Sequence, residues 1–132
     1  MILGHGLDLT DTDRIAHLLD EHGERFLSRC FTADERAYGE THAKRRVEVY
    51  AARFAAKEAV LKALGTGLAG GIQWTDVEVV RDALGKPGVK LHGKAAQVAD
   101  ERGITSWSLS LTHVRGMAAA SAIASGEAGR GK

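Results

Sequence analysis

The first third of the chain has the pattern of one strand followed by two helices. Residues 2–10 (ILGHGLDLT) alternate apolar residues with small or polar ones, which predicts a strand with Asp8 near its end. DTDRIAHLLDEHG follows, with aspartates in its first turn, apolar residues at helical spacing and Gly23 as a stop. In TADE, Thr32 is followed three residues later by Glu35, a capping box that predicts the start of a short helix.

The remaining two thirds predict a long helix and two antiparallel hairpins. The long helix should run from about 46 to 64 and end at Gly65, because GTGLAGG is too rich in glycine for a helix or strand. Alternating patterns predict four strands: DVEVVRD (76–82), VKL after the turn LGKPG, TSWSLSLTH (105–113) and MAAASAIAS. Glycines bound a further short helix over 93–103, between the second and third of these strands. This order predicts one α+β domain over 1–125 with an antiparallel sheet, and a disordered tail over 126–132.

The long helix carries charge where hydrocarbon is expected. At 100° per residue, Lys57 falls within the apolar stripe, Glu58 lies on its edge, and Lys62 follows one turn later. Lys57 is explained either by a snorkelling side chain or by a ligand. Glu58 and Lys62 are explained either by a surface ion pair or by a site for a metal-bound polyphosphate. Alanines on the same side as Glu58 favour the second reading, because they allow a close approach to the helix.

A magnesium ion held against phosphates typically takes one or two carboxylates, so a second one is expected. Asp8 is the candidate, since Gly4 and Gly6 beside it indicate the close approach of another backbone or of a ligand. The alternative is that Asp8 caps the next helix, but Thr10, Asp11 and Thr12 lie closer to its first turn.

Composition and charge exclude several classes of protein. Apolar residues make up 44% and charged residues 27% of the 132 residues, which is ordinary for a globular domain. A net charge of +1 does not favour a nucleic-acid partner, and no apolar run is long enough to span a membrane. The N-terminus lacks the pattern of a signal peptide, and Cys30 has no partner for an internal disulfide; we expect a cytoplasmic protein.

Other polar groups give weaker signals. The six histidines lack the spacing of a helical zinc site. His113, at the end of a strand, could donate to a phosphate or be an ordinary surface residue. The basic run Lys44, Arg45 and Arg46 could hold a phosphate or be a solvated helix end.

Taken in order, these segments resemble the bacterial holo-acyl-carrier-protein synthases, the small 4′-phosphopantetheinyl transferases. The resemblance covers the chain to about residue 125 and is carried by GHGLDLTDTDRI, FTADERAY, RFAAKEAVLKALGTG, GIQWTDVEV, GKPGVKLHGKA and SLSLTH before an alanine-rich strand. It implies the phosphopantetheinyl transferase fold, in which an antiparallel sheet packs with a long helix and shorter helices. It also implies transfer of 4′-phosphopantetheine from coenzyme A to a serine of an acyl carrier protein, with release of adenosine 3′,5′-bisphosphate.

The resemblance assigns roles residue by residue. Asp8 and Glu58 would hold Mg²⁺, and Glu58, directly or through a water on the metal, would be the base for the serine. Lys57, Lys62 and His113 would contact phosphates, and Arg45 or Arg46 would meet the 3′-phosphate. The coenzyme A cleft would also include Arg53, Gly65 and the turn Gly85, Lys86 and Pro87. The acidic carrier would dock on Arg14, Arg25 and Arg29.

Two positions depart from the family pattern and bear on the metal's surroundings: Asp11 stands where a glutamate is common, and Thr12 where an apolar residue is. The family forms trimers with sites between subunits, and the small residues of MAAASAIAS together with a lean core give a trimer some physical footing. Two other functions remain open: a non-catalytic module that binds coenzyme A or a nucleotide, and a nucleic-acid binder using residues 44–46. The joint presence of Asp8, Glu58 and Lys62 favours the enzyme.

Overall fold

The computed structural model describes residues 1–127, which form one α+β unit. Its helices and strands follow the predicted order: β1 (Ile2–Asp11), α1 (Thr12–Cys30), α2 (Ala33–Thr41), α3 (Arg46–Leu64), β2 (Val77–Arg81), β3 (Pro87–Leu91), α4 (Gly93–Glu101), β4 (Ile104–Val114) and β5 (Met117–Gly126). Short 3₁₀ turns lie at Ala43–Arg45 and Trp74–Asp76.

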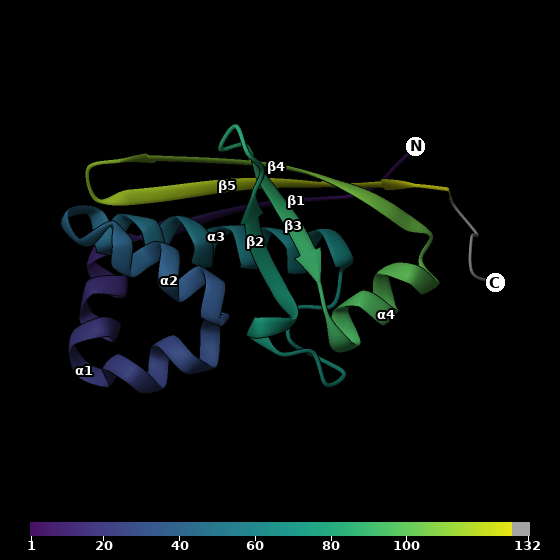
Figure 1. Cartoon of the computed structure of the whole chain (residues 1–132). Coiled ribbons are helices and arrows are strands. Elements are labelled where there is room, and N and C mark those ends of the chain that lie inside the picture. Colours follow the sequence, from purple (N-terminus) through teal and green to yellow (C-terminus); the bar gives the residue numbers. More distant parts are fainter. Residues whose placement is uncertain (128–132) are drawn as a thin grey trace.

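The main sheet has the strand order β1-β5-β4, and every pairing in it is antiparallel. Strands β2 and β3 form a separate hairpin, and the predicted antiparallel α+β class is therefore confirmed. Helix α3 lies along one face of the main sheet, with α1 and α2 at one end and α4 towards the other (Figure 1). The β2–β3 hairpin crosses in front of α3 (Figure 1).

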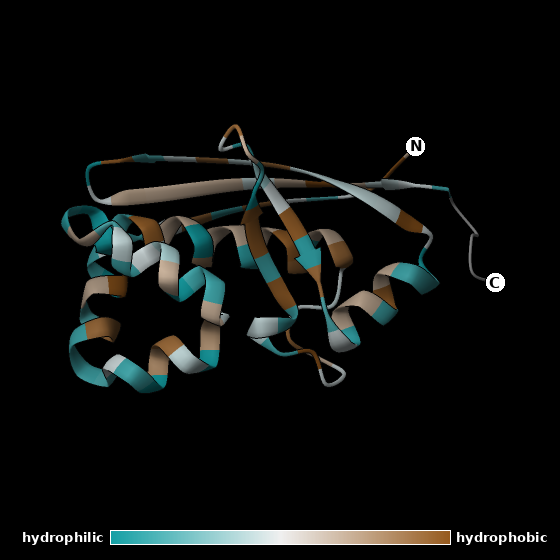
Figure 2. Cartoon of the chain, in the orientation of Figure 1, coloured by the Kyte–Doolittle hydropathy of each residue, from teal (hydrophilic) through white to brown (hydrophobic). Residues whose placement is uncertain are grey.

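The sheet face turned towards α3 is lined with alanine. Alternate residues of β5 pack under the helix and are almost fully buried: Ala118, Ala120, Ala122 and Ala124. These four small residues thus serve the packing of α3 within one chain, whereas Ala119, Ser121 and Ser125 alternate with them onto the opposite face and are half-buried. On the opposite face, Leu7 and Leu9 of β1 are 58% and 64% exposed. This mixture of apolar and polar positions along the strands is visible in Figure 2.

Two glycines bring β1 into contact with the backbone of α3. A Cβ atom on Gly6 would lie 1.8 Å from the carbonyl oxygen of Ala59, and one on Gly4 would lie 2.1 Å from that of Ala63. The close approach that these glycines predict is therefore made by another backbone. Because only glycine allows this distance, the strand and the helix are held in one register.

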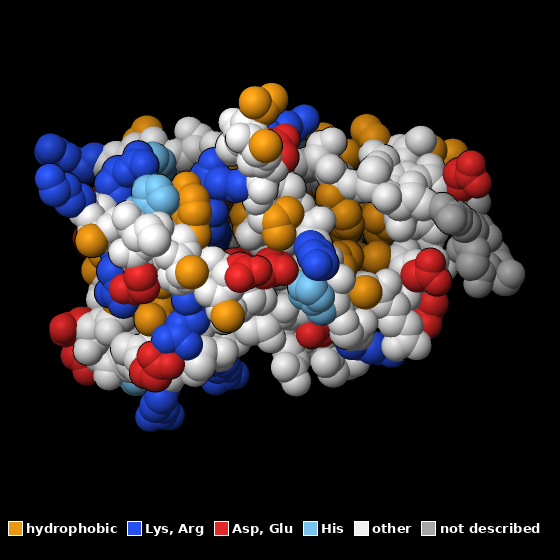
Figure 3. Space-filling model, in the orientation of Figure 1, with side chains coloured by type: hydrophobic (Ala, Val, Ile, Leu, Met, Phe, Trp, Pro, Cys, Tyr) orange, Lys and Arg blue, Asp and Glu red, His pale blue; other side chains and the backbone are white. Residues whose placement is uncertain are grey.

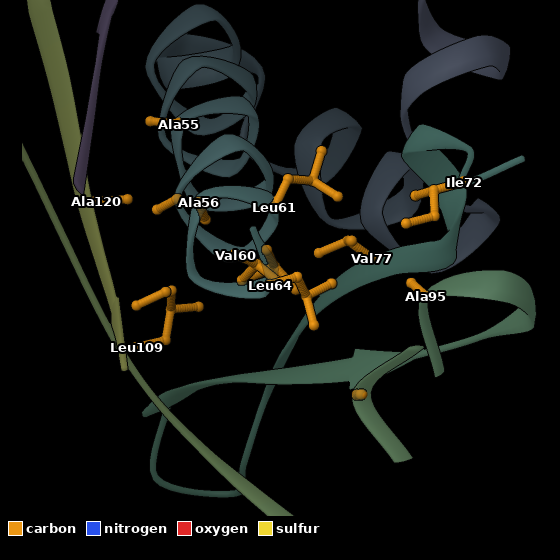
Figure 4. Close-up of a cluster of buried hydrophobic side chains, with 14 residues drawn as sticks. Ala55, Ala56, Val60, Leu61, Leu64, Ile72, Val77, Ala95, Leu109 and Ala120 are labelled. Carbon is orange, nitrogen blue, oxygen red and sulfur yellow. The ribbon is translucent and has the colours of Figure 1, made fainter. Parts of the chain in front are cut away.

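The buried apolar side chains form two clusters that meet at α3. One lies between α3, the sheet, the β2–β3 hairpin and α4, and Figure 4 shows its members converging from these elements, among them Val60, Leu64, Val77 and Leu109. The other lies between α3, α1 and the start of α2 and contains five of its larger side chains: Ile15, Phe26, Phe31, Tyr50 and Phe54. Helix α3 is buried on nearly all sides, so it is the centre of the fold.

The predicted boundaries hold to within two residues except in α1. Helix α1 does not stop at Gly23: the chain bends there, with φ 43° and ψ −115°, and then continues to Cys30 because Phe26, Leu27 and Cys30 are buried at helical spacing. Strand β5 includes Gly126, and Glu127 donates its N–H to the carbonyl of Gly103. The rest of the predicted tail, 128–132, lies outside the described residues. Within 1–127, no helix is long and apolar enough to cross a bilayer.

Replacing Gly6 with alanine should disrupt the fold. The new Cβ would overlap the Ala59 carbonyl, so we expect Gly6→Ala to lower the free energy of unfolding by about 3 kcal/mol or more. Gly88→Ala in β3 is the matched control, because its Cβ would meet Val80 at an ordinary 3.6 Å. Urea denaturation followed by circular dichroism measures both. Equal effects for the two variants would show that the β1–α3 contact yields easily.

Candidate functional site

Asp8, Glu58 and Lys62 lie together where β1 runs beside α3. Asp8 is 8% exposed, and its carboxylate accepts a hydrogen bond from the Lys62 ammonium at 2.9 Å. The same ammonium donates to the carbonyl of Leu7 at 3.0 Å, and the Thr10 hydroxyl lies 3.5 Å from the other Asp8 oxygen. Asp8 does not cap α1; Asp11 does, by accepting from the N–H of Asp13 at 2.8 Å.

Glu58 is half-buried beside Asp8, and its pKa is raised. Burial is the main cause, followed by the hydrogen bond and the like charge of Asp8, while Arg14 and Lys62 oppose the shift. A carboxyl group whose ionisation is disfavoured by burial and by a neighbouring carboxylate is an arrangement that a divalent cation or a proton stabilises. Among the described residues no group of three or more His, Cys, Asp or Glu side chains is placed to hold a metal, so a cation at this pair needs oxygen ligands from elsewhere.

Lys57 takes no part in this cluster. Its side chain is fully buried and its ammonium donates to Glu35 at 2.7 Å, to the carbonyl of Trp74 at 3.3 Å and to the carbonyl of Val77. Burial lowers the pKa of Lys57, although the nearby Glu35 carboxylate opposes this. The expectation that Lys57 contacts a phosphate does not hold, because all three of its N–H groups are used inside the protein; nor does its ammonium snorkel to solvent.

Glu35 is the buried partner that joins three elements. Its carboxylate accepts from the backbone N–H of Thr32 and of Val79 as well as from Lys57, and Thr32 completes the predicted capping box at the start of α2. The pair therefore links α2, α3 and β2. A buried ion pair with this number of hydrogen bonds is satisfied, and loss of either partner would leave an uncompensated charge.

A second group of polar side chains lines a cavity of about 210 Å³ on the other flank of α3. Three of the predicted residues, Arg45, Arg53 and His113, lie on its wall, together with Glu48 and several residues that include Tyr38, Arg81, Leu111 and Thr112. Figure 3 shows Lys, Arg and His side chains gathered around a hollow on this face of the molecule. The excess of cationic groups over the single carboxylate makes the cavity a place for an anion.

The other predicted coenzyme A residues are distributed around these two groups. Arg46 does not line the cavity, because its guanidinium is paired with Glu40 at 2.9 Å. Gly65 ends α3 in the left-handed conformation, one turn beyond Lys62. Gly85, Lys86 and Pro87 form the β2–β3 turn, and Arg81 donates to the carbonyl of Gly85 at 2.6 Å. The turn is thereby connected to the cavity wall.

Within one chain the two groups lie on different flanks of α3. Asp8 is on β1 and His113 on β4, with β5 between them, so they occupy opposite edges of the sheet. On the helix, Glu58 and Val49, which lines the cavity, are nine residues apart, or about 180° around the axis. Within a single chain Glu58 and Lys62 therefore lie apart from His113. The sequence prediction took His113 from a neighbouring subunit, and that shared site stays a prediction.

The three arginines predicted to bind a protein partner share one region. Arg25 and Arg29 line a cavity of about 320 Å³ with Leu18, His22 and Phe26. Arg14 stands 5.5 Å from the centre of the Phe54 ring and is close enough to Glu58 to influence its pKa. The surface of α1 therefore presents positive charge beside the carboxylate pair.

Sequence reasoning missed three residues that the structure makes prominent. Glu35 was identified only as a capping residue of α2. The same carboxylate that accepts from the Thr32 N–H also pairs with the buried Lys57. Tyr38 and Arg81 line the cavity. The available sequence signals were the position of Tyr38 in FTADERAY and that of Arg81 at the end of an alternating strand.

Comparison with known proteins places this geometry in a family. Residues 4–119 match the model of the 4′-phosphopantetheinyl transferase superfamily. The chain is 48% identical over 123 residues to the holo-[acyl-carrier-protein] synthase of Koribacter versatilis, covering 93% of this chain and 98% of that protein. It is 45% identical over 123 residues to the protein of the same name from Solibacter usitatus, with the same coverage of 93% and 98%.

Solved structures of such enzymes have the same fold. The holo-[acyl-carrier-protein] synthase of Neisseria meningitidis superimposes with a TM-score of 0.85 at 36% identity, over 95% of this chain and 99% of that one. The Helicobacter pylori enzyme, solved in complex with coenzyme A, gives a TM-score of 0.80 at 26% identity, over 92% and 99% of the two chains.

The contribution of the buried Lys57–Glu35 ion pair to stability can be tested. Lys57→Met leaves the Glu35 carboxylate without its counter-ion, so we expect the free energy of unfolding to fall by about 3–5 kcal/mol. Arg36→Met breaks the exposed pair with Glu24 and should cost less than about 1 kcal/mol. Adding Glu35→Gln to Lys57→Met should recover part of the loss. Urea denaturation decides: equal effects of the two single substitutions would contradict a structural role for the buried pair.

Proposed function

The chain belongs to the 4′-phosphopantetheinyl transferase superfamily, and on that premise we propose that it is a holo-acyl-carrier-protein synthase. It transfers 4′-phosphopantetheine from coenzyme A to a serine of an acyl carrier protein and releases adenosine 3′,5′-bisphosphate. The observation that carries the proposal is the cluster of Asp8, Glu58 and Lys62, which a module that only binds coenzyme A would not need.

Asp8 and Glu58 suit a magnesium ion. Mg²⁺ prefers oxygen ligands and typically takes one or two carboxylates while phosphates and waters complete its coordination. Two adjacent carboxyl groups, one of them with its pKa raised by burial and by the other, match that requirement. When bound, the ion would shield the charge of the pyrophosphate.

The chain's own residues supply the remaining chemistry. The serine hydroxyl attacks the β-phosphorus, a new P–O bond forms, and the bond to the leaving adenosine 3′,5′-bisphosphate breaks. Glu58 is the group placed to take the serine proton, and its raised pKa makes it a better proton acceptor than an ordinary carboxylate. Lys62, whose side chain is 55% exposed, presents its ammonium to the phosphates.

The cationic cavity suits the adenosine end of coenzyme A. Arg45, Arg53 and His113 surround it, and the Gly85–Pro87 turn adjoins it through Arg81. A 3′-phosphate in this cavity would meet more positive than negative charge. Arg45 is thus preferred over Arg46, whose guanidinium is already paired.

The carrier protein would dock on α1. Acyl carrier proteins are acidic. Arg25 and Arg29 present positive charge around the apolar Leu18 and Phe26, and Arg14 lies against the ring of Phe54. Arg14 lies near Glu58, so a carrier bound here would bring its serine towards the carboxylate pair. The cytoplasmic location stays a prediction.

The complete site would be shared between subunits of a trimer. Coenzyme A is small enough to require its pyrophosphate and its 3′-phosphate subsites side by side, whereas the two groups lie on opposite flanks of α3 within one chain. A neighbouring copy could supply the missing half. The exposed Leu7 and Leu9 on the open face of the sheet support such an assembly.

The first test is the reaction with and without the Glu58 charge. An apo acyl carrier protein incubated with the chain, coenzyme A and Mg²⁺ should gain the mass of one phosphopantetheine, and none with excess chelator. Glu58→Gln should lower turnover by orders of magnitude while the melting temperature stays nearly unchanged, and Asp8→Asn should act likewise. Lys94→Gln, on the exposed side of α4, is the control. No mass gain on any of several carriers would favour the binding module instead.

The second test is complementation between inactive subunits. Glu58→Gln and His113→Ala each damage every site of their own trimer, but mixed trimers contain some sites built from two intact halves. With random assortment in a closed ring, roughly a quarter of the sites should regain activity. Mass spectrometry of the intact assembly confirms mixing. Mixed trimers without regained activity, or a fully active monomer, would rule out a shared site.

A further inference from the structure

The cationic cavity contains an arginine with an unmet hydrogen-bonding demand. Arg53 is 2% exposed, and its Nε has no hydrogen-bond partner. Its guanidinium lies over the ring of Tyr38, 4.0 Å from the centre, and the side chain lines the cavity. A buried polar group is ordinarily satisfied, so this atom points to a partner that binds from outside the chain.

Arg81 brings a second guanidinium to the same ring. Its Cζ is 5.0 Å from the centre of Tyr38, and its Nη1 donates to the carbonyl of Gly85 at 2.6 Å. The two arginines share one aromatic ring, and within residues 1–127 neither forms an ion pair with a carboxylate. Burial lowers the pKa of Arg53, and the positive charge of Arg81 lowers it further, because the two like charges repel each other.

Two like charges held together in this way are stabilised by an anion that carries more than one negative charge. Glu48 is the single acidic residue on the cavity wall and cannot balance Arg45, Arg53 and Arg81. A phosphomonoester dianion would satisfy the free Arg53 Nε and relieve the repulsion, whereas a hydroxyl in its place could accept from Nε but has no negative charge to offset the two guanidinium groups.

We propose that Arg81, held by Tyr38 and by the Gly85 carbonyl, is a specificity-determining residue that makes the enzyme select ligands with a phosphomonoester on the adenosine ribose. This rests on the proposed function, because it assumes that the adenosine end of coenzyme A occupies the cavity. Arg81 then distinguishes coenzyme A from its 3′-dephospho form, while Asp8, Glu58 and Lys62 act on the pyrophosphate that both share.

Binding measurements test the proposal without depending on catalysis. Isothermal titration calorimetry compares adenosine 3′,5′-bisphosphate with adenosine 5′-monophosphate, which lacks the 3′-phosphate. The native chain should bind the bisphosphate more tightly, and Arg81→Gln should weaken bisphosphate binding about tenfold, the loss expected for one charged hydrogen bond, while changing monophosphate binding less than about twofold. Lys94→Gln removes the same charge from α4 and should change neither.

Kinetics supply the second measurement. In Arg81→Gln, the ratio of kcat/KM for coenzyme A to that for 3′-dephospho-coenzyme A should fall about tenfold. The fall should come from a lower kcat/KM for coenzyme A, with the value for the dephospho form unchanged. Equal losses of kcat/KM for both ligands would show that Arg81 only shapes the turn, and no loss for either ligand would show that it contacts no phosphate; either result overturns the proposal. Absence of transfer by the native chain would instead defeat the proposed function, and the calorimetric ratio would still decide the role of Arg81. Because Arg81 is exposed, the variant should fold, and circular dichroism verifies this.

Discussion

The contact between the backbones of β1 and α3 is the constraint on which the rest of the molecule depends. Gly6 leaves no room for a side chain against the Ala59 carbonyl, so the strand and helix have a single register. Asp8 is two residues beyond Gly6, and Glu58 immediately precedes Ala59. The same contact that closes the fold therefore sets the two carboxylates beside each other, and a rotation or slip of α3 would separate them.

The charges of α3 are divided by direction around the helix axis. Lys57 points inward to Glu35 and fixes the helix against α2 and β2, whereas Glu58 and Lys62 point along the β1 flank to Asp8. Lys57 and the Asp8 carboxylate thus each have a partner of opposite charge, as the low dielectric of the interior requires, whereas the buried Arg53 of the same helix forms no ion pair with the described residues. A helix that forms the core can carry this much charge because one ion pair is fully enclosed and the other opens to solvent.

Local patterns predicted the elements well because each depends on neighbours in sequence. The capping box at Thr32 and Glu35, the end of α3 at Gly65 and both hairpins follow from residue types within a few positions. The direction of Lys57 could not be predicted, because its partner Glu35 is 22 residues away and the choice between solvent and an internal carboxylate is a tertiary one. Tyr38 and Arg81 were missed for the same reason, since they meet only after α2 and the hairpin have packed. The kink at Gly23 shows the opposite case: the glycine signal was read correctly as a break, but buried Phe26 and Leu27 continue the helix beyond it.

The separation of the two charged groups bears on how such a site can be assembled. A carboxylate pair needs a cation, and a cluster of arginines needs an anion, so each half alone carries an electrostatic demand that its own chain does not meet. A ligand that joins a metal-bound pyrophosphate to a phosphomonoester satisfies both demands at once. Since α3 stands between the halves in one chain, that ligand would satisfy them most directly by bridging two copies, and its binding would then stabilise the assembly as well as the site.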